Sequence, residues 1–145
     1  MNTKEIVLKA INIEVDDFYL IESELFIELY KIQTKPDFIT AFLNLSSWKG
    51  TSLRSGVWTY FESTGTEDIE ITRKYIAEKI DNEEIVNMYA QGIHDYGNKI
   101  YQEKFDYPQE WLDESEEIDK WINMNMKQIA KICLDILRDN FEYFN

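Results

Sequence analysis

The chain has 145 residues, and its 28 Asp and Glu outnumber its 15 Lys and Arg, which gives a formal net charge of −13. This length predicts a single domain over residues 1–145, because domains most often contain about 100–150 residues. A surface this acidic repels phosphate groups, which argues against direct binding to DNA, RNA or an anionic membrane. We therefore expect cations or basic proteins as partners.

The cysteine content and the N-terminus point to a compartment. Cys133 is the only cysteine, so it cannot form an internal disulfide, as is typical of proteins in a reducing environment. Met1–Ala10 lacks the uninterrupted apolar run of a signal peptide. No apolar run approaches the roughly 18–20 residues of a membrane span. The sequence predicts a cytoplasmic protein.

The first expected element is ambiguous. Residues 5–15 alternate apolar and polar side chains like a strand, but their apolar spacing also fits a helix, and both alternatives stay open. Asp16 or Asp17 then has the side chain of a helix N-cap. The apolar spacing after them predicts a helix that runs to about Gln33.

The middle of the chain has alternating helix and loop signals. Pro36 suits the first turn of a short helix, and residues 46–56 have the composition of a loop. Thr66 is the expected cap of the next helix. Asp81 is expected to end that helix and to cap another, whose apolar stripe begins at Ile85.

The strongest helical signal is the last one. Apolar residues at steps of three and four predict a helix from Ser115 to Phe144, nearly 30 residues long, or roughly 45 Å at 1.5 Å per residue. Together these elements predict an all-α, single-domain bundle of about five to six helices with a long C-terminal helix. Pairing of that helix with its copy in a homodimer is an open alternative.

Catalytic and metal-binding patterns are scarce. His94 and Asp95 are adjacent, so on a helix their side chains point in different directions and do not form a dyad. Cys133 falls on the apolar stripe of the last helix, where a thiol acts as a core residue. One His and one Cys cannot fill a zinc site without carboxylates, and phosphate-binding glycine loops are absent. We expect no cofactor, no metal and no enzyme activity, with a carboxylate-dependent enzyme as the alternative.

The acidic residues cluster between positions 103 and 119, where they outnumber the single lysine eight to one. Bulky apolar residues interrupt the cluster, a mixture typical of protein-binding surfaces. The expected contact residues are Glu103, Asp106, Glu110, Asp113, Glu114, Glu116, Glu117 and Asp119. Weaker candidates are Glu22, Glu24, Glu67, Asp68 and Glu70. The alternative reading is that these acids only form a solvated face.

The spacing of such acids permits a sharper hypothesis. Side chains three or four positions apart on a helix hold their Cβ atoms about 5–6 Å apart. Duplex DNA carries one phosphate per about 3.4 Å on each strand. Rows of carboxylates on helices can therefore approximate a phosphate backbone, and a basic groove that binds DNA could accept them.

A glycine followed by aromatic residues stands out in the middle of the chain. The segment from Ser55 to Gly65 reads Ser-Gly-Val-Trp-Thr-Tyr-Phe-Glu-Ser-Thr-Gly. It resembles the Asn-Gly-Gly-Phe-x-Gln-Tyr-Phe-x-Asn-Ser motif of a bacterial α-helical family, which is named for a DNA-mimic protein whose C-terminal domain it describes. In that motif Gly56 would relax a turn, and the turn would be anchored by Trp58, Tyr60 and Phe61.

The resemblance implies an acidic protein that occupies the nucleic-acid site of a basic partner. We expect the partner to be a DNA-binding regulator, which the chain would inhibit by competing with DNA. The alternative is a nuclease toxin that the chain would neutralise as its immunity protein, because the same electrostatics would serve both.

Overall fold

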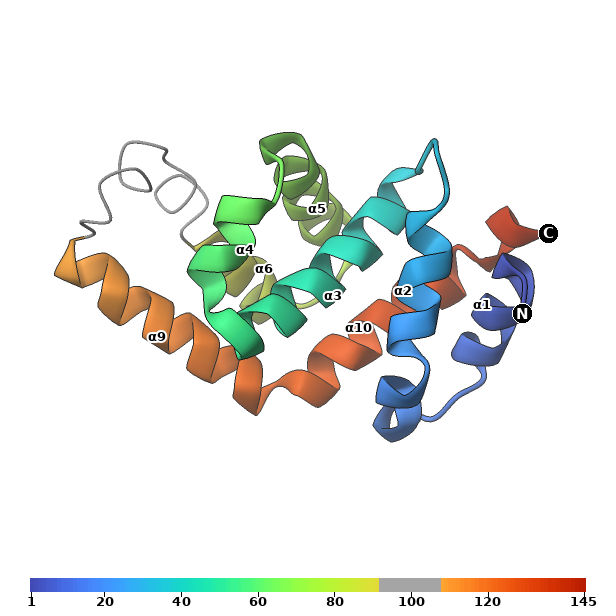
Figure 1. Cartoon of the computed structure of the whole chain (residues 1–145), viewed down its shortest axis with the longest axis horizontal. Coiled ribbons are helices and arrows are strands. Elements are labelled where there is room, and N and C mark those ends of the chain that lie inside the picture. The colour runs from blue at the N-terminus through green and yellow to red at the C-terminus, as the bar shows by residue number, and fades with distance from the viewer. Residues whose placement is uncertain (92–107) are drawn as a thin grey trace.

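Helices form the described part of the protein, which covers residues 1–91 and 108–145 of a computed structural model (Figure 1). These two ranges contain eight α-helices and two short 3₁₀ helices, and no strand. The predicted all-α class is confirmed, although the helices outnumber the predicted five to six. In chain order they are α1 (Thr3–Ile11), η1 (Val15–Leu20), α2 (Glu22–Tyr30), α3 (Asp37–Ser55), α4 (Val57–Ser63), α5 (Thr66–Lys79), α6 (Glu83–Ala90), α9 (Gln109–Met124), α10 (Met126–Asp139) and η2 (Phe141–Phe144).

Helix α3 runs through the centre of the fold, and α2, α4, α5, α9 and α10 pack against it (Figure 1). Buried residues occupy nearly every position from Phe38 to Leu45, as is typical of a helix surrounded by protein. Trp48 is fully buried one turn later. One hydrophobic core extends from α3 to both α1 and α10. The N- and C-terminal parts of the chain therefore share that core.

The predicted loop at residues 46–56 is wrong, because α3 continues to Ser55. The polar side chains of this segment are used inside the fold. Ser46 Oγ donates a hydrogen bond to Glu22 Oε2 at 3.0 Å, and Lys49 Nζ donates to Glu22 Oε1 at 2.7 Å. Tertiary contacts thus outweigh the weak helix propensity of the serines and glycine here.

The first segment is helical over Thr3–Ile11, so of the two alternatives for residues 5–15 the helix is confirmed. Its N-cap is Asn2, whose Oδ1 accepts a hydrogen bond from the Glu5 N–H at 2.8 Å. This bond satisfies one of the donors that the first helical turn leaves without a partner in the backbone. The alternating pattern of this short segment did not distinguish strand from helix.

The predicted helix between Asp16 and Gln33 is wrong in its start. Asp16 and Asp17 lie in the first turn of η1, and α2 begins only at Glu22. Phe18 gives the reason, since its side chain is 1% exposed and its ring meets that of Phe42 edge-on at 6.4 Å. The 3₁₀ helix η1 places Phe18 in the core, and α2 starts only after it.

The predicted boundaries around α5 and α6 are displaced by one residue. Thr66 is the first residue of α5 and the N-cap is Gly65, so Thr66 does not cap the helix. The cap of α6 is Asn82 instead of the predicted Asp81, and its Oδ1 accepts from the Ile85 N–H at 3.2 Å. The expected continuation of the Ile85 stripe beyond α6 lies outside the described residues.

The predicted helix from Ser115 to Phe144 is wrong as a single element, because it breaks at Asn125 into α9 and α10 (Figure 1). The Asn125 side chain donates to the Trp121 carbonyl at 2.8 Å, so it satisfies a carbonyl at the end of α9. Asn140 repeats this bond at the end of α10, to the Ile136 carbonyl at 2.8 Å. The periodicity of the apolar residues continued across these breaks and concealed them.

The start of α9 is also earlier than predicted. The helix begins at Gln109, directly after Pro108, and Ser115 lies in its second turn. Ser115 is buried, and its Oγ donates to the Leu112 carbonyl at 2.8 Å. Because its hydroxyl bonds a carbonyl of its own helix, this serine is accommodated inside α9 and does not cap it.

Candidate functional site

Helix α9 has a buried side that packs on the rest of the protein and an exposed side that carries acidic residues. α9 packs against α3 and α4, and its buried residues are Ser115, Ile118 and Ile122. On its outer side the carboxylates are exposed, and Leu112 is 38% exposed beside them. These exposed residues, here named the acidic face, are Glu110, Asp113, Glu116 and Glu117. Glu114 is half-buried.

The acidic face has no counter-ion among the residues that the structure describes. None of its four carboxylates forms an ion pair with the described part of the chain. Asp113 accepts a hydrogen bond from Gln109 Nε2 at 3.0 Å, which leaves its charge in place. Lys120 is the only basic residue in α9. The face therefore keeps a net negative charge at the margin of the fold (Figure 1).

Asp119 has a structural contact that the sequence did not reveal. Its Oδ1 accepts a hydrogen bond from the Val57 N–H at 3.0 Å, so a carboxylate of α9 meets the first turn of α4. Burial raises the pKa of this carboxyl group, the bond from Val57 lowers it, and the charge of Glu116 raises it further. Asp119 therefore joins two helices and is half-buried, unlike the exposed residues of the acidic face.

The other predicted acidic residues do not join the acidic face. Glu103 and Asp106 lie outside the described residues, as do His94 and Asp95. Glu22 is engaged by Lys49, and Glu70 forms an ion pair with Arg73. Glu24 is exposed on α2. The carboxylates of α5 lie at a different margin of the fold from α9 (Figure 1).

The glycine-aromatic segment forms the junction between α3 and α4. Gly56 has φ +89° and ψ 153°, a conformation that is essentially restricted to glycine. Tyr60 and Phe61 are buried, and the half-buried Trp58 ring lies 6.3 Å from that of Trp111 on α9. The expected turn at Gly56 and the aromatic anchors are thus present, although a helix follows the turn directly.

Two buried tyrosines form a hydrogen-bonded chain between three helices. The hydroxyls of Tyr60 and Tyr89 lie 2.6 Å apart, and Tyr60 donates to Asn44 Oδ1 at 3.2 Å. Burial is the main cause that raises the pKa of both phenols. Both therefore stay neutral at physiological pH, and they connect α3, α4 and α6.

The ion pair of Lys49 and Glu22 is also largely buried. The two side chains are 9% and 19% exposed, and Lys49 Nζ lies 5.7 Å from the centre of the Phe18 ring. Cys133 is fully buried, which raises the pKa of its thiol to about 12, with Lys49 opposing and Glu22 adding to the rise. The thiol is protonated at neutral pH, and the prediction that Cys133 is a core residue is confirmed.

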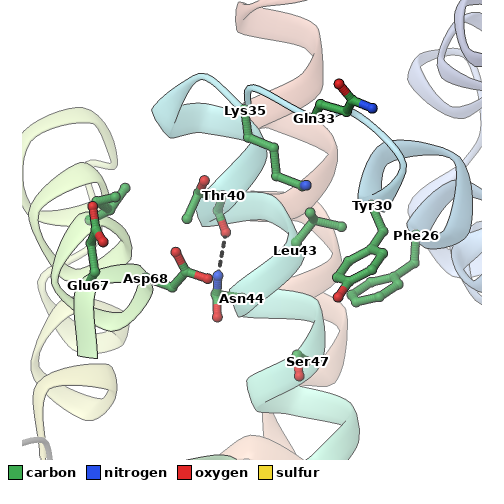
Figure 2. A pocket seen from close by; sticks show the side chains of 11 residues that line it. Phe26, Tyr30, Gln33, Lys35, Thr40, Leu43, Asn44, Ser47, Glu67 and Asp68 are labelled. Carbon is green, nitrogen blue, oxygen red and sulfur yellow. Dashed lines mark hydrogen bonds between the residues drawn. The ribbon is translucent and has the colours of Figure 1, made fainter. Parts of the chain in front are cut away.

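A groove of about 570 Å³ lies between α2 and α5, with α3 as its floor (Figure 2). Its α2 wall carries the stacked rings of Phe26 and Tyr30, whose centres are 6.1 Å apart. Lys35 projects from the segment between α2 and α3, and Glu67 and Asp68 stand on the α5 wall. Its volume falls within the roughly 300–1,000 Å³ of small-molecule sites. The sequence could not reveal the groove, because three separate segments form it.

No group of three or more His, Cys, Asp or Glu side chains in residues 1–91 and 108–145 is arranged to hold a metal ion. No helix in these ranges is long and apolar enough to cross a membrane.

Comparisons with protein-family models, with curated proteins and with solved structures were made for the whole chain. None of the three finds a match. The resemblance of the Ser55–Gly65 segment to the DNA-mimic family therefore stays a prediction, and function has to be argued from the chain's own surfaces.

Proposed function

We propose that this chain is an acidic binding protein whose acidic face engages a basic nucleic-acid-binding protein and competes there with DNA. One observation supports the proposal: four exposed carboxylates of α9 have no ion-pair partner in the described part of the chain. Carboxylates without internal counter-ions keep their negative potential, which attracts a positive surface and speeds its approach.

The arrangement of the acidic face suits such a partner. Glu110, Asp113 and Glu117 are three and four positions apart, which places their Cβ atoms about 5–6 Å from one another. Glu116 lies beside this row, four positions after Leu112, whose side chain is 38% exposed. Carboxylates would then stand in for phosphates, while the apolar side chain would add contact area that bare DNA does not offer.

Helix α9 is also held firmly enough to present these charges. Asp119 ties it to the start of α4, and the Trp121 indole N–H donates to the Glu84 carboxylate of α6. The Trp121 ring also lies 6.2 Å from that of the buried Trp48. A rigid row of charges loses less conformational entropy on binding than a mobile one would.

The first experiment identifies the partner. The immobilised protein is incubated with native lysate, bound proteins are eluted with salt, and mass spectrometry identifies them. We expect a basic DNA-binding regulator that duplex DNA displaces from the column. Recovery of a nuclease would instead assign the immunity role. If neither class were recovered, or if DNA failed to displace the captured protein, the proposal would be wrong.

A pair of variants with equal net charge then locates the contact. Asp113→Lys with Glu117→Lys reverses two charges on the acidic face, whereas Glu24→Lys with Glu78→Lys reverses two exposed charges on α2 and α5. We expect the first variant to lose at least tenfold in affinity for the captured protein and the second to stay within about threefold. An equal loss in both would show that only the net charge matters.

A further inference from the structure

The groove between α2 and α5 carries opposite charges that the described structure leaves without ion-pair partners. Lys35 forms no ion pair with a carboxylate in the described ranges, and neither Glu67 nor Asp68 forms one with a base. The Lys35 ammonium donates to the Ile32 carbonyl at 2.6 Å and lies 5.1 Å from the centre of the Tyr30 ring. These contacts hold the ammonium in place without neutralising it.

The charges stand on separate sides of the groove (Figure 2). Asp68 and Glu67 project from α5, and the Asp68 carboxylate points toward Asn44 on α3. Lys35 lies across the groove, on the side of Tyr30 and Leu43. A ligand lying between these sides would meet a negative wall at one end and a positive group at the other.

The groove floor offers a further polar group to a ligand. Thr40 is 6% exposed and lines the groove, yet its hydroxyl has no hydrogen-bond partner among the described residues. Only its backbone carbonyl is used, by Asn44 Nδ2 at 2.9 Å. Water in the groove can reach this hydroxyl, so a polar ligand atom would exchange a bond to water for a direct hydrogen bond, a net gain of about 0.5–1.5 kcal/mol.

The middle of the groove is apolar. Leu43 is 5% exposed on the floor, and the stacked rings of Phe26 and Tyr30 form the α2 wall beside it. Such a surface contacts a hydrocarbon or aromatic side chain, while the polar groups fix the orientation of the ligand.

We propose that this groove binds a small zwitterion with an apolar body, which is the chemistry of an amino acid or a short peptide with free termini. Its ammonium group binds Asp68, and Glu67 on the same wall adds negative potential. Its carboxylate binds Lys35, and its apolar side chain rests on Leu43 and the Phe26–Tyr30 stack. The Thr40 hydroxyl bonds a polar atom of the same ligand. This site is separate from the acidic face and does not depend on the proposed function.

Calorimetric titration of the full chain tests the proposal with phenylalanine, Ala-Phe and Ala-Ala-Phe as probes, which also decides between amino acid and peptide. The best probe is compared with its N-acetylated form, which lacks the ammonium, and its C-amidated form, which lacks the carboxylate. We expect each modification to weaken binding about tenfold or more, because each removes one charged hydrogen-bond partner.

Variants assign each end of the ligand. Asp68→Asn should abolish the discrimination against the acetylated probe, and Lys35→Met should abolish the discrimination against the amidated one. Thr40→Val, which keeps the shape of the side chain, should weaken the free probe about tenfold. Glu78→Gln is the matched control, because it removes an exposed carboxylate of α5 that does not line the groove. It should leave binding unchanged.

The proposal fails if no free probe binds more tightly than its acetylated and amidated forms. It also fails if Glu78→Gln weakens binding as much as Asp68→Asn does, since the effect would then come from the net charge of −13. Thermal unfolding monitored by circular dichroism verifies that each variant is folded, and Thr40→Ser, which retains the hydroxyl, should bind like the unmodified chain.

Discussion

The hydroxyl of Tyr60 is at the centre of a buried polar cluster. It donates to Asn44 Oδ1 and lies 2.6 Å from the Tyr89 hydroxyl, so Tyr89 can act as its donor. The groups that lose a hydrogen-bond partner therefore depend on whether the hydroxyl of Tyr60 or that of Tyr89 is removed. The two tyrosines are therefore not equivalent, although both are fully buried.

We expect Tyr60→Phe to lower the free energy of unfolding by about 1–3 kcal/mol, because it leaves Asn44 Oδ1 without its partner and removes one of the two partners of the Tyr89 hydroxyl, the other being Thr72. Tyr89→Phe should lower it by only about 1 kcal/mol, since the bond from Tyr60 to Asn44 survives. Urea unfolding of the two variants measures the difference. An equal loss would show that the bond to Asn44 contributes nothing.

At the scale of elements, the junction of α3, α4 and α9 depends on one backbone conformation and one carboxylate. Gly56 adopts a φ of +89°, and the next N–H, that of Val57, donates to Asp119. A Cβ added at Gly56 would lie 3.6 Å from Asp119 Oδ2, an ordinary contact. The requirement for glycine therefore comes from the backbone conformation and not from lack of space.

We expect Gly56→Ala to lower the free energy of unfolding by about 1–3 kcal/mol, because alanine is strained in this region. Gly50→Ala is the control: Gly50 lies inside α3 with open space around its Cβ position, so alanine should stabilise by about 0.5–1 kcal/mol. Thermal or urea unfolding gives both values. Loss of stability in the control but not at Gly56 would contradict this account.

The carboxyl group of Asp119 makes the same junction sensitive to pH. Burial raises its pKa in the folded protein above the ordinary value of about 3.9, so the folded state holds this proton more tightly than the unfolded state does. The stability that this group contributes is therefore complete below its unfolded pKa and is lost as the pH rises through its folded pKa.

We expect Asp119→Asn to remove this pH dependence, because asparagine stays neutral and its Oδ1 can still accept from the Val57 N–H. The variant should gain stability relative to the unmodified chain as the pH rises from below about 3.9, and the gain should level off above the raised pKa. Urea unfolding at a series of pH values measures it. A relative loss of stability with rising pH would reverse the assigned sign.

At the scale of the whole molecule, a net charge of −13 on 145 residues sets up self-repulsion in the folded state. Four of the six ion pairs in the described part join side chains only three or four positions apart, within one helical turn, and contribute little to stability. Lys49 and Glu22 are the pair shielded from solvent. Repulsion between unpaired carboxylates should therefore dominate the response to salt.

We expect the melting temperature to rise as sodium chloride increases from about 0.01 M to 0.15 M, because the Debye length falls from about 30 Å to 8 Å and weakens this repulsion. Differential scanning calorimetry at both concentrations measures the shift. The variant with Asp113→Lys and Glu117→Lys carries less net charge and should respond less. A melting temperature that falls with salt would show that attractive ion pairs prevail.

The sequence by itself determined the features that depend on composition and local spacing. Apolar residues at steps of three and four predicted the all-α class. The turn at Gly56 with its aromatic anchors was implied by the resemblance of residues 55–65 to a family motif. The burial of Cys133 followed from its place on an apolar stripe. The acids between positions 110 and 117 were expected at a binding surface, and Glu110, Asp113, Glu116 and Glu117 are exposed, while their role in binding stays a prediction.

Only the tertiary structure decided where helices end and which polar groups are used internally. Residues 46–55 are helical because Ser46 and Lys49 meet Glu22, which lies more than twenty positions earlier. Asp119 bonds Val57, and three segments form the groove with Lys35 and Asp68. Contacts between residues distant in sequence leave no local pattern, so composition and periodicity carried no signal for them.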